Sequence, residues 1–145
     1  MESFRINARD NLLLEIIAYQ IATDQSDYFN RYKRSLHLYE SYLFEKLFKM
    51  KRASNNLIEG ILKRNKFKFL NSSRDTFFKM ETHTISNYKG HSIKKYENQK
   101  FEVLLNYLNQ LENKALQKAL FDQLTRINQF VNGLETYHLN RSYVE

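Results

Sequence analysis

The chain has 145 residues, the length of a single domain, and contains no Pro, no Cys and only three Gly. So few turn residues favour long helices over many short strands, and the lack of Cys excludes disulfide bonds and thiolate metal sites. The formal net charge is +7. Residues 31–69 carry eleven Lys and Arg against three acids, a local excess of +8. Such an excess predicts an anionic partner for this segment.

The first apolar run of the chain, which begins near Leu12, has no cationic leader before it and is interrupted by polar residues. It is shorter than the roughly 20 apolar residues that span a bilayer. We therefore expect a soluble, cytoplasmic protein without a membrane partner.

Two helices are expected in the first part of the chain, because apolar residues recur there at spacings of three and four. The first runs from Ala8 to Thr23, and the polar run 24–27 is expected to end it and to cap the next helix. The apolar face of the first helix is Leu12, Leu13, Ile16, Ile17 and Ile21. The second helix follows Phe29, Tyr32, Leu36, Tyr39, Leu43, Leu47 and Met50. It is expected to continue, with or without a kink, through Ala53, Leu57 and Ile61; the alternative is a stop and restart at residues 54–56.

A loop is predicted over residues 63–73, followed by a short third helix that ends near Gly90. The longest helical pattern then runs from Ser92 to about His138. Its first seam is Phe101, Leu104, Leu108, Leu111 and Ala115, and its second is Leu116, Leu120, Leu124, Ile127, Val131, Leu134 and His138. The register slips near residues 112–116, which indicates either a stutter in one helix or a joint between two.

These patterns predict an all-α protein with a single domain, residues 1–145. The expected architecture is an antiparallel bundle of four or five helices, with two long amphipathic helices. If residues 92–138 formed one helix, it would be on the order of 70 Å long. The two seams and a helix of that length offer more apolar face than the shorter helices can cover, so we expect a homo-oligomer.

Arg31 and His37 are separated by five residues. This spacing resembles the Arg-x(4–6)-His signature of HEPN domains, small helical bundles that often act as ribonucleases. The resemblance covers these two residues and implies, by analogy, that they would be the site residues for RNA cleavage. Tyr32 stands where that family commonly has a polar residue.

Two histidines stand three residues from a glutamate, which places each pair on one helix face: His37 with Glu40, and His138 with Glu135. Glu135-x-x-His138 resembles part of the ferritin-like di-iron pattern, which uses two such motifs and two further Glu residues. The resemblance implies a metal-binding bundle, but the chain supplies a single motif in this orientation. Because the ligand set is incomplete, we expect no metal and no other cofactor.

Two clusters of cations lie within the basic segment. Lys and Arg neutralise phosphates and release counterions, and exposed aromatic rings stack on unpaired bases. We therefore predict a nucleic-acid contact made by Lys46, Lys49, Lys51 and Arg52 in the first cluster and by Lys63, Arg64, Lys66, Phe67 and Lys68 in the second. The alternative without a ligand is that these cations complement the dipole at a helix C-terminus.

The sequence thus favours a non-enzymatic accessory protein, a basic helical bundle that contacts the backbone of RNA or DNA, alone or within a larger complex. It has no Gly-rich phosphate loop, Gly-x-Ser-x-Gly elbow or His-Glu-x-x-His motif that would indicate an enzyme. One alternative is a helical protein–protein adaptor that binds an acidic protein. The other is a small HEPN-like ribonuclease or metal-binding bundle that uses His37 or His138.

Overall fold

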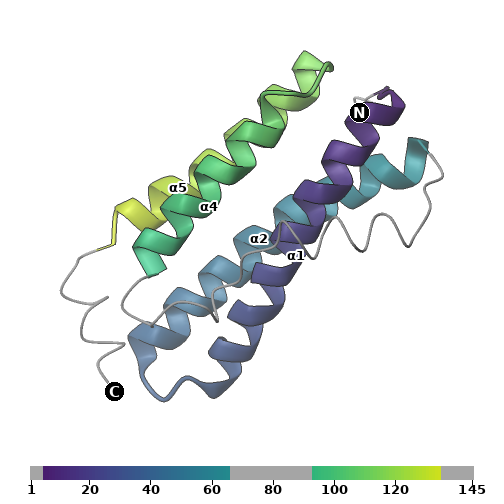
Figure 1. Ribbon diagram of the computed structural model, residues 1–145. Coiled ribbons are helices and arrows are strands. Elements are labelled where there is room, and N and C mark those ends of the chain that lie inside the picture. The colour runs from purple at the N-terminus through teal and green to yellow at the C-terminus, as the bar shows by residue number, and fades with distance from the viewer. Residues whose placement is uncertain (1–4, 66–92, 135–145) are drawn as a thin grey trace.

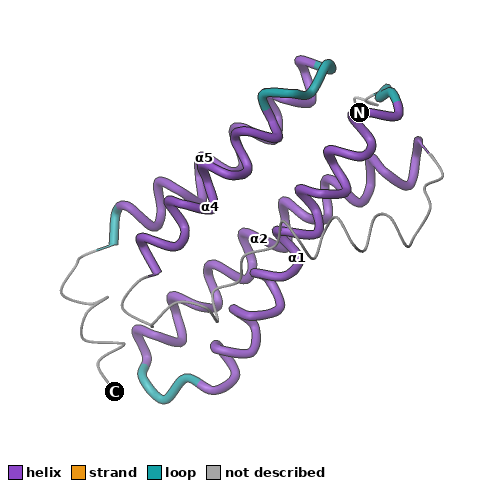
Figure 2. Tube along the Cα trace, in the orientation of Figure 1, coloured by secondary structure: helices purple, strands orange, loops and turns teal. Residues whose placement is uncertain are grey.

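A computed structural model describes residues 5–65 and 93–134, which form four helices (Figure 1; Figure 2). Helix α1 spans Ala8–Arg34, α2 spans Leu38–Asn65, α4 spans Ile93–Leu108 and α5 spans Lys114–Asn132. No strand occurs within these two ranges. The prediction of an all-α antiparallel bundle is therefore confirmed.

Helix α1 begins at Ala8 because Asn7 caps it: the Asn7 side-chain oxygen accepts a hydrogen bond from the Asp10 backbone N–H at 2.8 Å. The helix does not end at residue 23, so the break expected at residues 24–27 is wrong. Asp24 is buried and paired with cations from other helices. Its carboxylate therefore has partners in the core and does not compete for backbone N–H groups, as it would at a cap.

The turn between α1 and α2 lies instead at residues 35–37. Ser35 is the C-cap of α1, and its backbone N–H donates to the Tyr32 carbonyl at 3.2 Å. Because the chain reverses direction here, Leu36 does not continue an apolar helix face as expected. Both Leu36 and Leu38 are exposed at this end of the bundle, Leu38 to 93 %.

Helix α2 is continuous, so the expected continuation through residue 61 is confirmed. Its last turn includes Lys63 and Arg64, which means that the predicted loop does not begin at residue 63. The remainder of that loop and the predicted third helix lie outside the described residues. The buried face of α2 is Leu43, Phe44, Leu47, Lys51, Ser54, Ile58 and Ile61.

Of the two alternatives for residues 92–138, a stutter in one helix or a joint between two, the structure shows the joint: α4 ends at Leu108 and α5 begins at Lys114. Asn113 caps α5: its side-chain oxygen accepts from the Leu116 backbone N–H at 3.0 Å. The two longest helices of the described residues are therefore α1 and α2. The homo-oligomer prediction loses the argument from helix length on which it was based.

The helices pair as two antiparallel hairpins, α1 with α2 and α4 with α5, which lie side by side (Figure 1). None of the helices in residues 5–65 and 93–134 has a stretch long and apolar enough to cross a membrane. The shared core includes Leu14, Ile17, Leu47, Ile58, Leu104, Leu108, Leu120 and Leu124. The second apolar seam of the sequence is thus a core seam of α5, with its residues from Leu116 to Val131 buried.

Asp10 joins the two hairpins at one end of the bundle. Its two carboxylate oxygens accept hydrogen bonds from the backbone N–H groups of Glu112 and Asn113, at 2.9 and 3.1 Å. These groups lie at the start of α5, where a helix leaves donors unpaired and carries partial positive charge. The buried carboxylate therefore fixes the α4–α5 turn against the start of α1.

Replacing Leu108 by Ala should lower the free energy of unfolding by about 2–5 kcal/mol, because its side chain is completely buried in the core. Leu38→Ala makes the same truncation at an exposed site and should change stability by less than about 0.5 kcal/mol. Urea denaturation followed by circular dichroism measures both. Equal losses in the two variants would contradict this packing.

Candidate functional site

Helix α2 presents five exposed cations on its outer side and along its flank, where Lys46 lies 5.9 Å from the Phe130 ring centre of α5. At 3.6 residues per turn, Lys49, Arg52 and Lys63 lie opposite the buried Leu47 and Ile58. From first to last the cations extend over about 27 Å of helix. We term them the basic face of α2: Lys46, Lys49, Arg52, Lys63 and Arg64.

Few acidic residues of α2 lie close enough to the basic face to neutralise its charge. Glu59 is exposed on the same helix, and Glu45 lies 3.5 Å from the Lys49 ammonium group. Such an exposed ion pair is worth little, so it does not prevent Lys49 from contacting another anion. Lys66, Phe67 and Lys68, the rest of the predicted contact, lie outside the described residues.

Lys51 was predicted to belong to the nucleic-acid contact, but it lies on the opposite side of α2. Its side chain is 2 % exposed. The ammonium group is 2.8 Å from Glu97 Oε1 of α4 and 3.4 Å from Asp24 Oδ2 of α1. An ammonium group held between two buried carboxylates does not reach a phosphate at the surface. We therefore correct the predicted contact by leaving Lys51 out of it.

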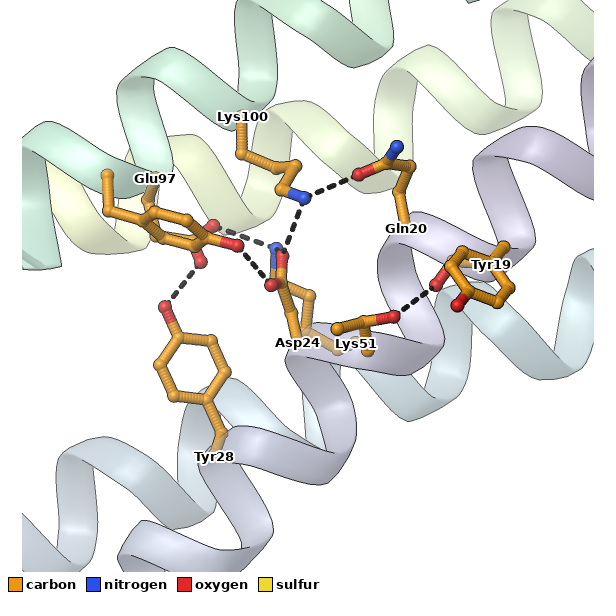
Figure 3. A network of polar contacts seen from close by, with 9 residues as sticks. Tyr19, Gln20, Asp24, Tyr28, Lys51, Glu97 and Lys100 are labelled. Atoms are coloured by element: carbon orange, nitrogen blue, oxygen red, sulfur yellow. Dashed lines mark hydrogen bonds and ion pairs between the residues drawn. The ribbon is translucent and has the colours of Figure 1, made fainter. Parts of the chain in front are cut away.

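Lys51 is part of a group of polar side chains from α1, α2 and α4 in the interior of the bundle (Figure 3). Its two carboxylates face two ammonium groups, so the formal charges cancel. The Tyr28 hydroxyl of α1 donates a hydrogen bond to the Glu97 carboxylate of α4. We term the group the buried polar cluster: Gln20, Asp24, Tyr28, Lys51, Tyr96, Glu97 and Lys100.

The second ammonium group of the cluster belongs to Lys100 of α4. It donates to Gln20 Oε1 at 2.7 Å and lies 3.8 Å from Asp24 Oδ2 (Figure 3). Asp24 also accepts a hydrogen bond from the Tyr96 hydroxyl. Since these contacts connect α4 with α1, and Lys51 connects both with α2, the cluster joins the two hairpins.

Burial and neighbouring charges act on the pKa values of the cluster in opposite directions. Burial raises the pKa of Asp24 from 3.8 to about 6, against the effects of Lys51 and Lys100. Burial disfavours the charged form of Lys51, but Glu97 and Asp24 outweigh it, so the pKa of Lys51 is raised. For Lys100 burial prevails, and its pKa is lowered. At pH 7 Asp24 is therefore ionised and pairs with Lys51.

The sequence holds a signal for the cluster in the positions of Asp24 and Lys51 along their helices. Asp24 lies three residues after Ile21 and four before Tyr28, and Lys51 lies four residues after Leu47. Both charged residues thus continue the apolar stripe of their helix. A charge on such a stripe indicates a buried group that requires a partner. Spacing alone does not show which helix supplies that partner.

A small pocket reaches the cluster between α2, α4 and α5. It is lined by Lys51, Glu97 and Lys100 on one side and mainly by apolar side chains of α4 and α5 on the other. Its free space accommodates about one water molecule, whereas sites for small molecules enclose roughly 300–1,000 Å³. We therefore interpret the buried polar cluster as a structural element and not as a substrate site.

Arg31 lies in the last turn of α1, whereas His37 lies beyond the end of that helix. The Arg31 guanidinium group lies 5.8 Å from the Phe44 ring centre, while His37 is exposed in the turn that precedes α2. Glu135 and His138 lie outside the described residues. Within residues 5–65 and 93–134, no three His, Asp or Glu side chains come close enough together to hold a metal ion.

Two neighbouring aromatic rings, with a cation at each end, form a row that crosses from α1 to α2. The Phe29 and Phe48 ring centres are 4.9 Å apart, and the rings are inclined by 41°. The Lys33 ammonium group lies 4.6 Å from the Phe29 ring centre, and the Arg52 guanidinium group lies 4.9 Å from that of Phe48. We term these residues the aromatic row: Lys33, Phe29, Phe48 and Arg52. Arg52 belongs also to the basic face of α2.

Comparison with known proteins adds no assignment: no protein-family model, no curated protein and no solved structure matches the chain. The function is therefore inferred from the side chains themselves. The basic face of α2 is exposed, and so is the aromatic row except for the half-buried Phe48. Both carry an excess of cations, which suits them to an anionic partner.

Replacing Lys51 by Met should lower the free energy of unfolding by about 3–5 kcal/mol, because it leaves the buried carboxylates of Asp24 and Glu97 without their shared cation. Lys49→Met, the matched change on the exposed side of α2, should alter stability by less than about 0.5 kcal/mol. Urea denaturation at pH 7 measures both. If the two variants are equally stable, the buried ion pair is absent.

Asp24 should stabilise the folded protein more at mildly acidic pH than at neutral pH. Since its pKa is about 6 in the folded state against an ordinary 3.8, the folded state binds this proton more tightly than the unfolded state does. The resulting contribution to the unfolding free energy is fully present below about pH 4 and is lost as the pH rises through about 6.

The unfolding free energy of the native protein minus that of Asp24→Asn should therefore fall between about pH 4 and 6 and level off above about pH 7. The other carboxyl groups are common to both proteins, so their contributions largely cancel in this difference. A nuclear magnetic resonance titration of the Asp24 carboxyl group gives its pKa directly. A carboxyl group that titrates below its ordinary value would show that the cations outweigh burial.

Proposed function

We propose that this protein is a non-enzymatic accessory protein that contacts the backbone of RNA or DNA through the basic face of α2. The observation that carries the proposal is the placement of five exposed cations along one side of one helix, about 27 Å from end to end. Duplex DNA carries one negative charge per roughly 1.7 Å of its axis. A fixed row of cations of this length therefore suits several phosphates at once, with release of their counterions.

Contacts of this kind position a nucleic acid without reading its sequence, because phosphates are the same at every base. Lys33 and Arg34, exposed in the last turn of α1, extend the positive surface beyond α2. The buried polar cluster supports this role indirectly. With Lys51 paired in the interior, α2 presents Lys49 and Arg52 to solvent.

The competing function is a helical adaptor for an acidic protein, since the same cations would attract acidic side chains. The aromatic row favours a nucleic acid, because Phe29 and Phe48 offer rings beside the cations on which bases can stack. An acidic protein surface has no comparable requirement for aromatic faces. A cytoplasmic location and a place within a larger complex belong to the same proposal.

Replacing Lys49, Arg52, Lys63 and Arg64 by Gln should weaken binding to RNA and DNA of any sequence. For the native protein, log K should fall with log salt by about 0.7–0.9 per phosphate neutralised, and the variant should lower that slope by up to about 3. Fluorescence anisotropy with labelled oligonucleotides at several salt concentrations measures both quantities.

The matched control replaces four exposed cations on α4 and α5 by Gln: Lys95, Lys114, Lys118 and Arg126. It removes the same net charge and should keep most of the affinity and slope. Equal losses in both variants would show that net charge alone attracts the nucleic acid. If the native protein binds no polynucleotide at low salt but binds one acidic protein saturably, the adaptor function replaces the proposed one.

A further inference from the structure

The two rings of the aromatic row meet at the edge of the α1–α2 pair, where Phe29 is exposed and Phe48 is half-buried. Phe29 is 37 % exposed, and Phe48 lies beside it on the neighbouring helix. Because the rings are inclined by 41°, neither covers the whole face of the other. The Tyr32 ring lies 6.5 Å from Phe29 and adds a third aromatic group to the same surface. The pairing of α1 with α2 therefore fixes an aromatic platform at the protein surface.

Cations occupy the ring faces in the free protein. Lys33 lies over Phe29 and Arg52 over Phe48, and both cations are exposed. A cation–π contact at an exposed site is weaker than the stacking of a base on an aromatic ring. An arriving base can therefore take the place of the cation on the ring. The displaced cation is then free to pair with the adjoining phosphate. After the exchange the ring contacts the base and the cation contacts the phosphate.

The platform is continuous with the proposed backbone contact. Arg52 belongs to both surfaces, and Lys49 lies one residue after Phe48 along α2. A strand whose phosphates follow the basic face of α2 would pass the aromatic row at Phe48. Base faces are free for stacking only where the strand is unpaired, because in a duplex each base is covered by its neighbours.

We propose that the aromatic row stacks unpaired bases, so that the nucleic acid bound by this protein is single-stranded. This inference rests on the proposed function and names the substrate class of the same surface. Lys33 and Phe29 of α1 and Phe48 and Arg52 of α2 are its residues. The basic face of α2 supplies the backbone contact, and the two rings distinguish a strand with accessible bases from one without them.

The test compares three labelled probes of equal length: a single strand, the same strand with abasic sites, and the duplex. The native protein should bind the single strand about five- to a hundredfold more tightly than the abasic strand, which keeps the phosphates and lacks the bases. It should also bind the single strand more tightly than the duplex, although the duplex has the higher charge density. Both comparisons use the unaltered protein, so they do not depend on the folding of a variant.

The double variant Phe29→Leu and Phe48→Leu keeps apolar side chains at both positions and removes the aromatic faces. It should bind the single strand and the abasic strand equally, with the salt dependence of the native protein. Phe121→Leu is the matched control, because Phe121 is 43 % exposed on α5, away from this surface. It should preserve the preference for the strand with bases.

Two results would overturn the inference, and they can be told apart. If the native protein binds the single strand and the abasic strand equally, and binding still depends on salt, the stacking site is absent while the backbone contact stands. If it binds none of the three probes at low salt, the proposed function fails and the stacking site fails with it.

Discussion

The Lys51 ammonium group, held between Asp24 and Glu97, is the contact on which the arrangement of the two hairpins depends. Moving these charges out of water costs several kcal/mol per ion, so the pair adds less to stability than a well-packed apolar core would. The ion pair instead favours one arrangement of the helices over others. A shift of α4 by one helical turn would leave a buried charge without its partner, and such a state is strongly disfavoured. We infer that the buried polar cluster sets the register of the bundle.

The same contact determines which cations of α2 lie at the surface. Residues 31–69 hold an excess of +8, but position along the chain does not decide what reaches the surface. With Lys51 turned inward, the geometry of a helix places Lys49 and Arg52 on the outer side, next to the aromatic row. Both proposed roles of this surface therefore rest on a core contact that involves no ligand.

Local spacing was sufficient for the features that depend on one helix at a time. It predicted the all-α class and the core seam of α5, because each follows from apolar periodicity within one helix. It located the register slip near residues 112–116 but did not decide between a stutter and a joint. Local spacing failed where contacts between residues far apart in the sequence determine the structure. The polar run 24–27 resembles a helix end, yet Asp24 meets Lys51, which is 27 residues away. Lys51 in turn meets Glu97, 46 residues further on. The aromatic row was missed for the same reason, since Phe29 and Phe48 meet only once α1 and α2 have paired.

The central claim is that α2 divides its lysines between the core and a nucleic-acid contact, and lysine acylation read by mass spectrometry tests it most directly. The free, folded protein should be modified at Lys46, Lys49 and Lys63 and protected at Lys51 and Lys100. Addition of a single-stranded polynucleotide at low salt should protect the three exposed lysines, while Lys95 and Lys118 on the other hairpin stay reactive. Modification of Lys51 at the rate of Lys49 in the folded protein would contradict the buried cluster. Unchanged labelling of the basic face when the polynucleotide is added would contradict the contact.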